Sequence, residues 1–261
     1  MADTLGAELA RYYDLDLLDD PGDLEMYLAL ASAHAGPILE LAAGSGRICV
    51  PLAAVGHNVT AVDRDGRMLA RARRAWKKAR PEPLGKLDLI ERDVTELRLE
   101  RRFGLVILAL NTLLVLGDRS AQRKALQVMA RHLAADGRAV IDVWLPSPDD
   151  LALYDGRVVL DWVRRDPEAD QWVAKSSSAR YSPATQRATV TTLFDTWSDG
   201  DQSRRTMRVD EIAFVGASEL VLLAEAAGLI VETQAEDYEM TPLSSSGERI
   251  VLVARARPES A

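Results

Sequence analysis

The sequence predicts an α/β protein with a mostly parallel sheet covered by helices on both faces, together with a separate antiparallel sheet. Three observations lead to this fold class. Between residue 37 and about 145, short apolar runs alternate with longer amphipathic segments, as in βαβ units. Between about 157 and 215 the chain changes to stretches rich in Val, Thr and aromatic residues joined by short turns. From 218 onward a helical segment and two apolar runs follow, which we expect to return to the first sheet.

The alternating region contains five predicted strands and three predicted helices. Each strand is a short apolar run, and the segments between the strands carry apolar residues at helical spacing. Asp65 is placed to cap the second helix, and Gly137 to end the third. The strands are 38–41, 58–62, 87–91, 105–110 and 138–144, and the helices are 47–55, 66–79 and 120–134.

The second region contains four predicted strands, at 158–165, 171–181, 188–198 and 204–215. Turn residues such as Ser182-Pro183 and Asp199-Gly200 separate them. Links this short predict an antiparallel meander, because a parallel crossover needs a dozen or more residues. A helix at 218–227, ended by Gly228, and strands at 229–233 and 249–254 complete the pattern.

We therefore expect one core with an insertion between its fifth strand and its last helix. The expected parts are an N-terminal helical cap segment (1–36), a ligand-binding core (37–145), an antiparallel β insertion (146–216) and a C-terminal part of the core (217–261).

Composition and charge argue against several classes of function. The net charge of −8 disfavours a nucleic-acid backbone as the main partner, because such binders concentrate Lys and Arg. A basic run from Arg67 to Arg80 is better explained as the solvated face of the helix at 66–79. The longest apolar stretch, 105–116, is too short to span a bilayer, and the N-terminus lacks a secretory pattern. We expect a cytoplasmic protein without a membrane partner, and Cys49 as a buried, inert thiol.

The most informative stretch runs from Glu40 to Arg47, between the first strand and the first helix of the core. Gly44 and Gly46 allow a sharp turn and let a ligand lie against bare peptide groups, although a glycine turn alone is a weak signal. Asp63 ends the second strand, where a carboxylate can accept hydrogen bonds from both hydroxyls of a ribose. Glu91-Arg92-Asp93 closes the third strand, where a carboxylate can accept from an adenine amino group. Together these positions predict a nucleoside site at the carboxyl edge of a parallel sheet.

These residues resemble the motifs of the class I S-adenosylmethionine (SAM)-dependent methyltransferases. In that family the first strand carries an acidic residue before a glycine-rich turn, matched by Glu40 and Gly44-Ser45-Gly46. An acidic residue ends strand two, matched by Asp63, and an Asp followed by an apolar residue ends strand three, matched by Asp93-Val94. The resemblance implies a Rossmann-like sheet of seven strands, the last antiparallel, over 37–145 and 217–255. It also implies SAM as cofactor and methyl transfer to a small-molecule acceptor.

The resemblance further implies which residues contact SAM. In the family the loop after strand four, here 110–113, lies under the methionine portion. The N-terminal Arg11-Tyr12-Tyr13-Asp14 resembles a segment that many small-molecule members fold over the cofactor, although an ordinary docking segment explains it equally well. Ala42 is a departure, because the family usually has its first glycine there. The predicted cofactor-binding residues are Tyr13, Glu40, Ala42, Gly44, Gly46, Asp63, Arg64, Asp93, Val94 and Leu110.

No catalytic residue is assigned, because methyl transfer from SAM needs a general base only if the acceptor starts protonated. His34, His57 and His132 precede predicted strands, so we expect them at the amino edge of the sheet in structural roles. We expect no metal site.

The insertion is the predicted acceptor lid, since residues 144–216 hold eight of the fourteen aromatic residues. The need to cover an added sheet explains the same residues without an acceptor. The acceptor-site candidates are Asn111, Trp144, Arg180 and Tyr181.

Several alternatives remain after this reasoning. A nicotinamide cofactor is disfavoured because the turn lacks the full G-x-G-x-x-G spacing. Nucleic-acid methylation is disfavoured by the acidic charge, and because Asn111 is followed by Thr112-Leu113 rather than by Pro-Pro-aromatic. A protein that binds SAM without methyl transfer, or uses it for another reaction, is compatible with the sequence, since fold does not fix function. The sequence does not name the acceptor atom (N, O or C), and it is compatible with a homodimer.

Overall fold

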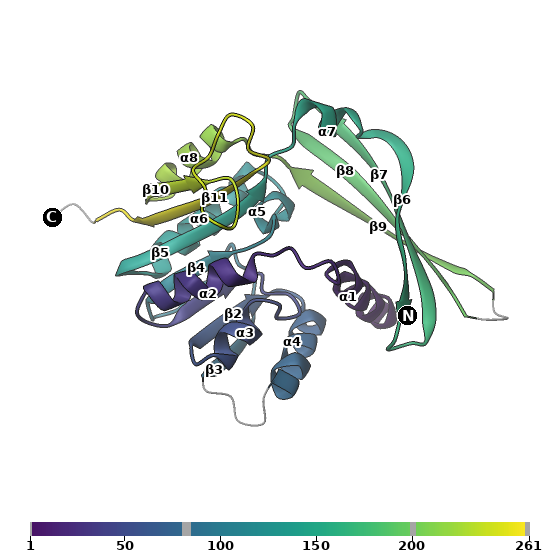
Figure 1. Ribbon diagram of the computed structural model, residues 1–261, viewed down its shortest axis with the longest axis horizontal. Coiled ribbons are helices and arrows are strands. Elements are labelled where there is room, and N and C mark those ends of the chain that lie inside the picture. Colours follow the sequence, from purple (N-terminus) through teal and green to yellow (C-terminus); the bar gives the residue numbers. More distant parts are fainter. Residues whose placement is uncertain (1, 80–84, 199–201, 259–261) are drawn as a thin grey trace. The chain divides into compact units, whose positions relative to one another are not determined.

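The computed structural model describes residues 2–79, 85–198 and 202–258, and the chain divides into two compact units (Figure 1). The first unit takes the described residues up to Leu113, then Asp118–Leu145, and those from Gly216 onward. The second takes Leu114–Gly117 and Pro146–Val215. The finer four-part division at residues 36, 145 and 216 stays a prediction.

The first unit is built on a seven-stranded sheet in the order β10-β11-β5-β4-β1-β2-β3. β1 to β5 pair in parallel, whereas β11 is antiparallel to both of its neighbours. The strands are β1 (Ile38–Leu41), β2 (Asn58–Asp63), β3 (Lys86–Glu91), β4 (Phe103–Leu108), β5 (Leu133–Trp144), β10 (Leu229–Ala235) and β11 (Arg249–Ala256). The predicted fold class is confirmed, including the antiparallel last strand.

Helices cover the first sheet, and every residue of β1 and β4 is buried. α4 has the predicted bounds, and the Asp65 side chain caps it by accepting a hydrogen bond from the Arg67 amide at 2.9 Å. An ion pair between Arg71 and Asp14 joins α4 to α1. The helices are α1 (Ala2–Asp16), α2 (Leu24–Ala33), α3 (Cys49–Ala54), α4 (Gly66–Ala79), the single turn α5 (Thr112–Val115), α6 (Arg119–His132) and α8 (Ala217–Ala226). Within the described ranges, none of these helices has the length and apolar character needed to cross a membrane.

Two predicted boundaries are wrong around β4 and β5. α6 ends at His132, and β5 already begins at Leu133, which pairs with Phe103. Gly137 is therefore not a helix stop but a point of close approach, where a Cβ would lie 2.6 Å from the Phe103 carbonyl oxygen. The second wrong boundary is the C-terminal end of β4, which we predicted at residue 110. β4 ends at Leu108, and Leu110 has a positive φ of 46°, which lies outside the β region.

The second unit is a four-stranded antiparallel sheet in the order β6-β7-β8-β9, which confirms the predicted meander (Figure 1). Its strands are β6 (Asp155–Asp166), β7 (Gln171–Ser182), β8 (Arg187–Trp197) and β9 (Arg204–Ala213). The short helix α7 (Pro148–Ala152) precedes them and begins with a capping box between Ser147 and Asp150.

The side chains of the second sheet differ between its two faces. Val173, Phe194 and Thr206 lie on one face and are almost completely buried. Trp162 and Tyr181 belong to the same face, whereas Trp172 and Trp197 stack at 6.5 Å on the opposite face. The aromatic residues of the insertion are therefore divided between two environments rather than gathered on one.

Candidate cofactor site

The turn after β1 is held open by left-handed backbone conformations. Ala42, Gly44 and Gly46 have φ values of 55°, 58° and 96°. The Ala43 amide donates to the Val62 carbonyl at 3.0 Å, which ties the turn to the end of β2. A Cβ on Gly46 would lie 2.9 Å from the Val50 side chain, so the packing of α3 against the turn leaves room only for glycine there.

Asp63 joins the glycine turn to the end of β2. One of its carboxylate oxygens accepts a hydrogen bond from the Gly44 amide, and the other accepts from the Asp65 amide, both at 2.8 Å. A carboxylate can accept about four hydrogen bonds, so each oxygen keeps a lone pair for a further donor. Asp63 therefore has a structural role that the sequence did not indicate, besides the predicted contact to a ribose.

Glu40 is a buried carboxyl group at the other side of the turn. Its side chain is 3% exposed, and its Oε2 atom has no hydrogen-bond partner. Burial raises the pKa of Glu40 to about 8, although Arg47 and a hydrogen bond from the Cys49 thiol act in the opposite direction. Cys49 is itself buried, as predicted, and its pKa is raised by that burial. An unpartnered carboxylate oxygen in this position fits a ligand that carries a positive charge.

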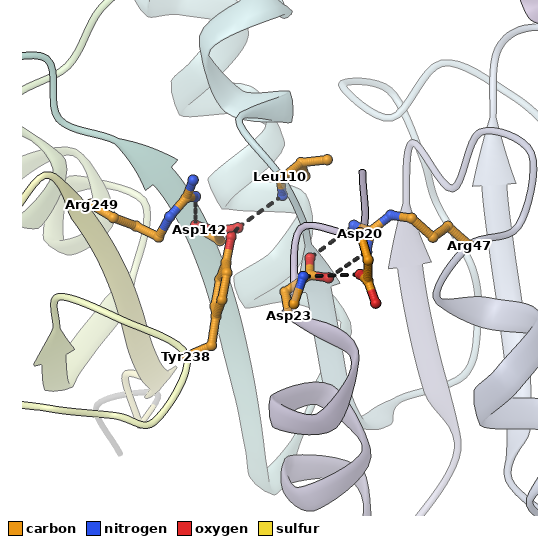
Figure 2. A network of polar contacts seen from close by, with 8 residues as sticks. Asp20, Asp23, Arg47, Leu110, Asp142, Tyr238 and Arg249 are labelled. Carbon is orange, nitrogen blue, oxygen red and sulfur yellow. Dashed lines mark hydrogen bonds and ion pairs between the residues drawn. The ribbon is translucent and has the colours of Figure 1, made fainter. Parts of the chain in front are cut away.

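The N-terminal segment contributes Tyr13, from α1, and Asp23, which directly precedes α2 and contacts Arg47 in Figure 2. Arg47 forms a bidentate ion pair with Asp23, which has no exposed surface, and the second contact of the pair measures 2.8 Å. Tyr13 lies at the glycine turn, since a Cβ on Gly44 would be 3.8 Å from its ring. Burial raises the pKa of Tyr13, which keeps its hydroxyl protonated. The structure thus places Tyr13 beside Gly44, and its contact with a cofactor stays a prediction.

The residues predicted to contact the adenosine part lie at the ends of β2 and β3. Arg64 is exposed, and with Glu91 it lines a cavity of about 600 Å³ at the carboxyl ends of these strands. Asp93 is also exposed, and its Oδ1 accepts hydrogen bonds from the amide and the hydroxyl of Thr95, both at 2.7 Å. These bonds lower the pKa of Asp93, so it is ionised and a ready acceptor. The side chain of Val94 is buried.

The loop after β4 is fixed by the end of β5. Leu110 and Asn111 both have positive φ, at 46° and 62°. The Leu110 amide donates to Asp142 Oδ2 at 3.2 Å, and the Asn111 amide donates to the Asp142 carbonyl at 3.0 Å. The Asn111 side chain in turn accepts from the Trp144 amide at 2.6 Å. Two of the acceptor-site candidates, Asn111 and Trp144, are therefore adjacent. The side-chain oxygen of Asn111 already accepts the Trp144 amide hydrogen bond and so holds the loop.

A polar network centred on Asp142 was missed by sequence reasoning (Figure 2). Asp142 has no exposed surface and accepts hydrogen bonds from Tyr238 Oη, at 3.2 Å, and from Arg249. The Arg249 guanidinium also lies 5.0 Å from the centre of the Tyr238 ring. Burial raises the pKa of Asp142, whereas the charge of Arg249 lowers it. The sequence signal for this network was an aspartate in an otherwise apolar strand, because a buried carboxylate needs partners. Its partners could not be identified from the sequence, since they are about 100 residues away in the chain.

The other two acceptor-site candidates lie in the second unit. Arg180 and Tyr181 are consecutive residues of β7, so their side chains extend from opposite faces of the sheet. The Tyr181 ring packs edge-on against Phe214 at 5.8 Å. Arg180 is exposed, with its guanidinium against Gly156. The structure therefore does not bring these two residues to a common face.

His132 illustrates the structural role that we predicted for the histidines. It is fully buried, its Nε2 atom accepts a hydrogen bond from the Leu99 amide at 2.9 Å, and its Nδ1 atom lies 2.7 Å from the Val128 carbonyl. His34 contacts the Leu30 carbonyl through Nδ1 at 2.9 Å. Among the described residues there is no group of three or more His, Cys, Asp or Glu side chains arranged to hold a metal ion.

A seven-stranded sheet in this order, with a glycine turn after β1 and carboxylates at the ends of the next two strands, is a Rossmann-like arrangement with a ligand site at the carboxyl ends of its strands. Residues 38–137 match the family model described as a methyltransferase domain, which agrees with the resemblance found in the sequence motifs. A search of curated proteins finds no match.

Solved structures of SAM-dependent methyltransferases have the same fold over nearly the whole chain. A SAM-dependent methyltransferase from Clostridium acetobutylicum has a TM-score of 0.75 at 19% identity, covering 96% of this chain and 98% of its own. A sugar N-methyltransferase from Streptoalloteichus has a TM-score of 0.71 at 20% identity, covering 94% and 93%. An amino pentose methyltransferase from Micromonospora echinaspora, solved with SAM bound, has a TM-score of 0.69 at 20% identity, covering 94% and 96%. The second unit is thus part of the shared fold and not an addition peculiar to this chain.

The residues of the site fit SAM. The amino acid part of SAM carries an ammonium group, which is the kind of partner that the unpaired Glu40 oxygen lacks. The glycine turn offers bare backbone, and Asp63 keeps lone pairs for ribose hydroxyls.

Proposed function

We propose that this chain is a SAM-dependent methyltransferase that acts on a small molecule in the cytoplasm. The observation that carries the proposal is Glu40, a buried carboxyl group with an unpartnered oxygen beside a glycine turn, within the segment that matches a methyltransferase domain. A buried carboxyl group without a partner lowers stability, so its presence here is explained by a cationic ligand that completes it.

The residues of the first unit would hold SAM as follows. Glu40 pairs with the ammonium group, Asp63 accepts from the ribose, and Asp93 accepts from the adenine amino group. Tyr13 covers the cofactor beside Gly44. Ala42, Gly46, Arg64, Val94 and Leu110 complete the proposed set. When bound, SAM supplies an activated methyl group, so the chain has to orient the two reactants and exclude water.

For the acceptor we propose a small molecule, and amino sugars are the first class to test. Two of the similar structures belong to a sugar N-methyltransferase and an amino pentose methyltransferase. An amine that binds unprotonated needs no general base, which agrees with the structural use of His132. The acidic charge of −8 disfavours nucleic acid as acceptor. Asn111, Trp144, Arg180 and Tyr181 stay acceptor-site proposals.

The test compares the binding of SAM and of methylthioadenosine, which keeps the adenosine part but lacks the amino acid part. By calorimetry, we expect Glu40→Gln to weaken SAM binding about 10-fold or more through loss of a charge-assisted hydrogen bond, and to leave methylthioadenosine binding unchanged. Asp63→Ala should weaken both ligands, since both carry the ribose.

Three results would contradict the proposal. If the wild-type chain does not bind SAM, the cofactor is wrong. If Glu40→Gln weakens both ligands equally, the ammonium group is misplaced. If SAM binds tightly but no methylated product forms with amino sugars or with a wider panel of small amines, alcohols and carbon acids, the chain uses SAM for something other than methyl transfer.

A further inference from the structure

One face of the four-stranded sheet in the second unit is exposed and apolar. Strand pairing places Val158, Ser178, Thr191 and Val209 in one row across the sheet, and Leu160, Ser176, Leu193 and Met207 in the next. Residues paired in this way have their side chains on the same face. We call this surface the open face. It also carries Val163, Trp172 and Trp197.

The open face holds half of the exposed large apolar side chains among the described residues. Six of the twelve such side chains lie on it: Val158 (63% exposed), Leu160 (61%), Val163 (46%), Trp172 (37%), Met207 (62%) and Val209 (53%). The opposite face of the same sheet is the buried one, with Val173 and Phe194 at 2% exposure or less. An antiparallel sheet with one buried face normally presents polar side chains on the other. The open face departs from that pattern, which marks it as a surface that another surface covers.

The size of the open face suits an interface between proteins. The six side chains together expose roughly 500–600 Å² of surface, whereas each partner in a standard stable interface contributes about 800 Å². The six side chains alone therefore supply roughly two thirds of that area.

The charges around the open face favour a second copy of the same chain as the partner. Asp195 pairs with Arg205 at 2.7 Å near one end of the face, and Arg187 approaches Glu211 at 3.9 Å near the other. Because these opposite charges neutralise each other within one sheet, two copies can meet without the repulsion expected from a net charge of −8 on each chain. Arg180 is a further exposed cation on this face, because it extends from the same side of β7 as Ser176 and Ser178. The face therefore carries charges of both signs, which disfavours a strongly basic or strongly acidic partner.

The shape of the open face is also complementary to itself, because a row of small side chains lies beside a row of larger ones. Ala174, Ser176 and Ser178 on β7 form a line of small side chains beside the larger Val158 and Leu160 on β6. A two-fold axis can place the large row of each copy over the small row of the other, as when twisted sheets pack face to face about 10 Å apart.

The edge strands of the sheet disfavour edge-to-edge pairing, the other way in which two sheets associate. β6 contains two register shifts, between Asp155 and Val158 and between Leu160 and Trp162. Such bulges interrupt the row of free backbone groups that edge-to-edge pairing needs. The opposite edge, β9, carries Arg204, Arg205 and Arg208, and charged side chains also discourage pairing there.

We propose that the open face is the contact surface of a symmetric homodimer, in which the sheets of two copies pack face to face. The inference does not rest on methyl transfer, because it uses no residue of the cofactor site.

The test measures the mass of the full chain in solution by light scattering and sedimentation, with two variants on the open face and one matched control. At about 10 µM we expect the wild type at twice the 28.6 kDa of a single chain. Leu160→Asp and Met207→Asp each bury a charge within the contact, on β6 and β9 respectively, so the dissociation constant should rise about 100-fold or more. The control is Val159→Asp, because Val159 is next to Leu160 and 49% exposed but extends from the opposite face.

Each outcome supports or contradicts the open face as the dimer contact. Circular dichroism and thermal unfolding show whether each variant is folded, and Met207→Asp on β9 replaces Leu160→Asp if the latter is not. Dimeric wild type and control with monomeric face variants support the proposal. A monomeric wild type overturns it, and so does a dimer that survives both face variants or is lost equally in a folded Val159→Asp chain.

Discussion

The seven-stranded sheet of the first unit and the four-stranded sheet of the second bury their strands in different ways. In β4 every residue is buried, so consecutive side chains on both faces belong to the core. In β6 nearly every apolar side chain is exposed, and the second sheet has one buried face, to which β7, β8 and β9 contribute Val173, Phe194 and Thr206. The comparison shows that apolar content alone does not distinguish a core strand from a surface strand. Position in the sheet order decides it.

The largest expected effect tests this difference directly. Ile107→Ala and Leu108→Ala, at consecutive positions of β4, should each lower the free energy of unfolding by about 2–5 kcal/mol, because both side chains are completely buried. Val159→Ala and Leu160→Ala, at consecutive positions of β6, should each change it by no more than about 0.5 kcal/mol. Urea unfolding below 1 µM protein, roughly ten-fold under the concentration proposed for dimer formation, gives these values for the separate chain. A large loss at Val159 would mean that β6 is covered.

The next comparison concerns ion pairs in the two units. Asp142→Asn should destabilise the chain by about 2–4 kcal/mol, because Arg249, only 23% exposed, loses its charged partner. Asp195→Asn is the matched variant in the second unit, where Arg205 is 61% exposed, and we expect a loss below about 1 kcal/mol. Equal losses in thermal and urea unfolding would contradict the assignment of Asp142 as the centre of a buried network. Asp142→Asn should also weaken SAM binding, since Leu110 loses its anchor.

Glu40, in the first unit, is expected to make stability depend on pH. Folding raises the pKa of Glu40 from near 4.5 to about 8, so between these values the folded chain holds a proton that the unfolded chain has lost. The contribution of Glu40 to stability therefore falls as the pH rises through this window. Between pH 5.5 and 7.5 the wild type should lose about 2–3 kcal/mol relative to Glu40→Gln, in unfolding curves recorded without SAM. If the stability of the wild type and of Glu40→Gln changes with pH in the same way, folding does not raise the pKa of Glu40.

The smallest expected effect is a gain of stability. Ala42 at φ 55° and Gln186 at φ 52° occupy the left-handed region in the first and second units, respectively. Glycine relieves this strain, so Ala42→Gly and Gln186→Gly should each raise the free energy of unfolding by up to about 1 kcal/mol. A loss at Ala42 but not at Gln186 would mean that the Ala42 methyl group contributes packing at the turn that outweighs the strain.

The elements were predictable from the sequence where local chemistry determines them. The bounds of α4 follow from its apolar spacing and from Asp65, and the meander follows from turn residues such as Ser182-Pro183. The start of β5 was not predictable in this way, because Leu133 becomes a strand residue only by pairing with Phe103. Gly137 gave a misleading signal, since a helix end and a close backbone approach both require glycine.

The cofactor site was predictable to a similar degree. Glu40, the glycine turn and Asp63 are close in the sequence or at the ends of successive strands, so their meeting follows from the order of the elements. The second role of Asp63, as an acceptor for the Gly44 amide, depends on side-chain geometry that a pattern does not contain. The contacts of Asp142 with Tyr238 and Arg249 join parts of the chain whose distance in sequence hides their relation.

The place of β11 between β5 and β10 has a consequence for synthesis on the ribosome. β5 is complete at Trp144, but the strand that pairs with its free edge begins only at Arg249. At about 5–20 residues per second, roughly 100 residues of further translation leave that edge without a partner for about 5–20 s. The meander is made during this interval and can fold by itself through neighbouring pairings. The nascent chain therefore completes its later sheet first and closes its earlier sheet last. Truncation before Arg249 would leave the six residues of β5 that pair with β11, Ala139–Trp144, as an edge open to aggregation.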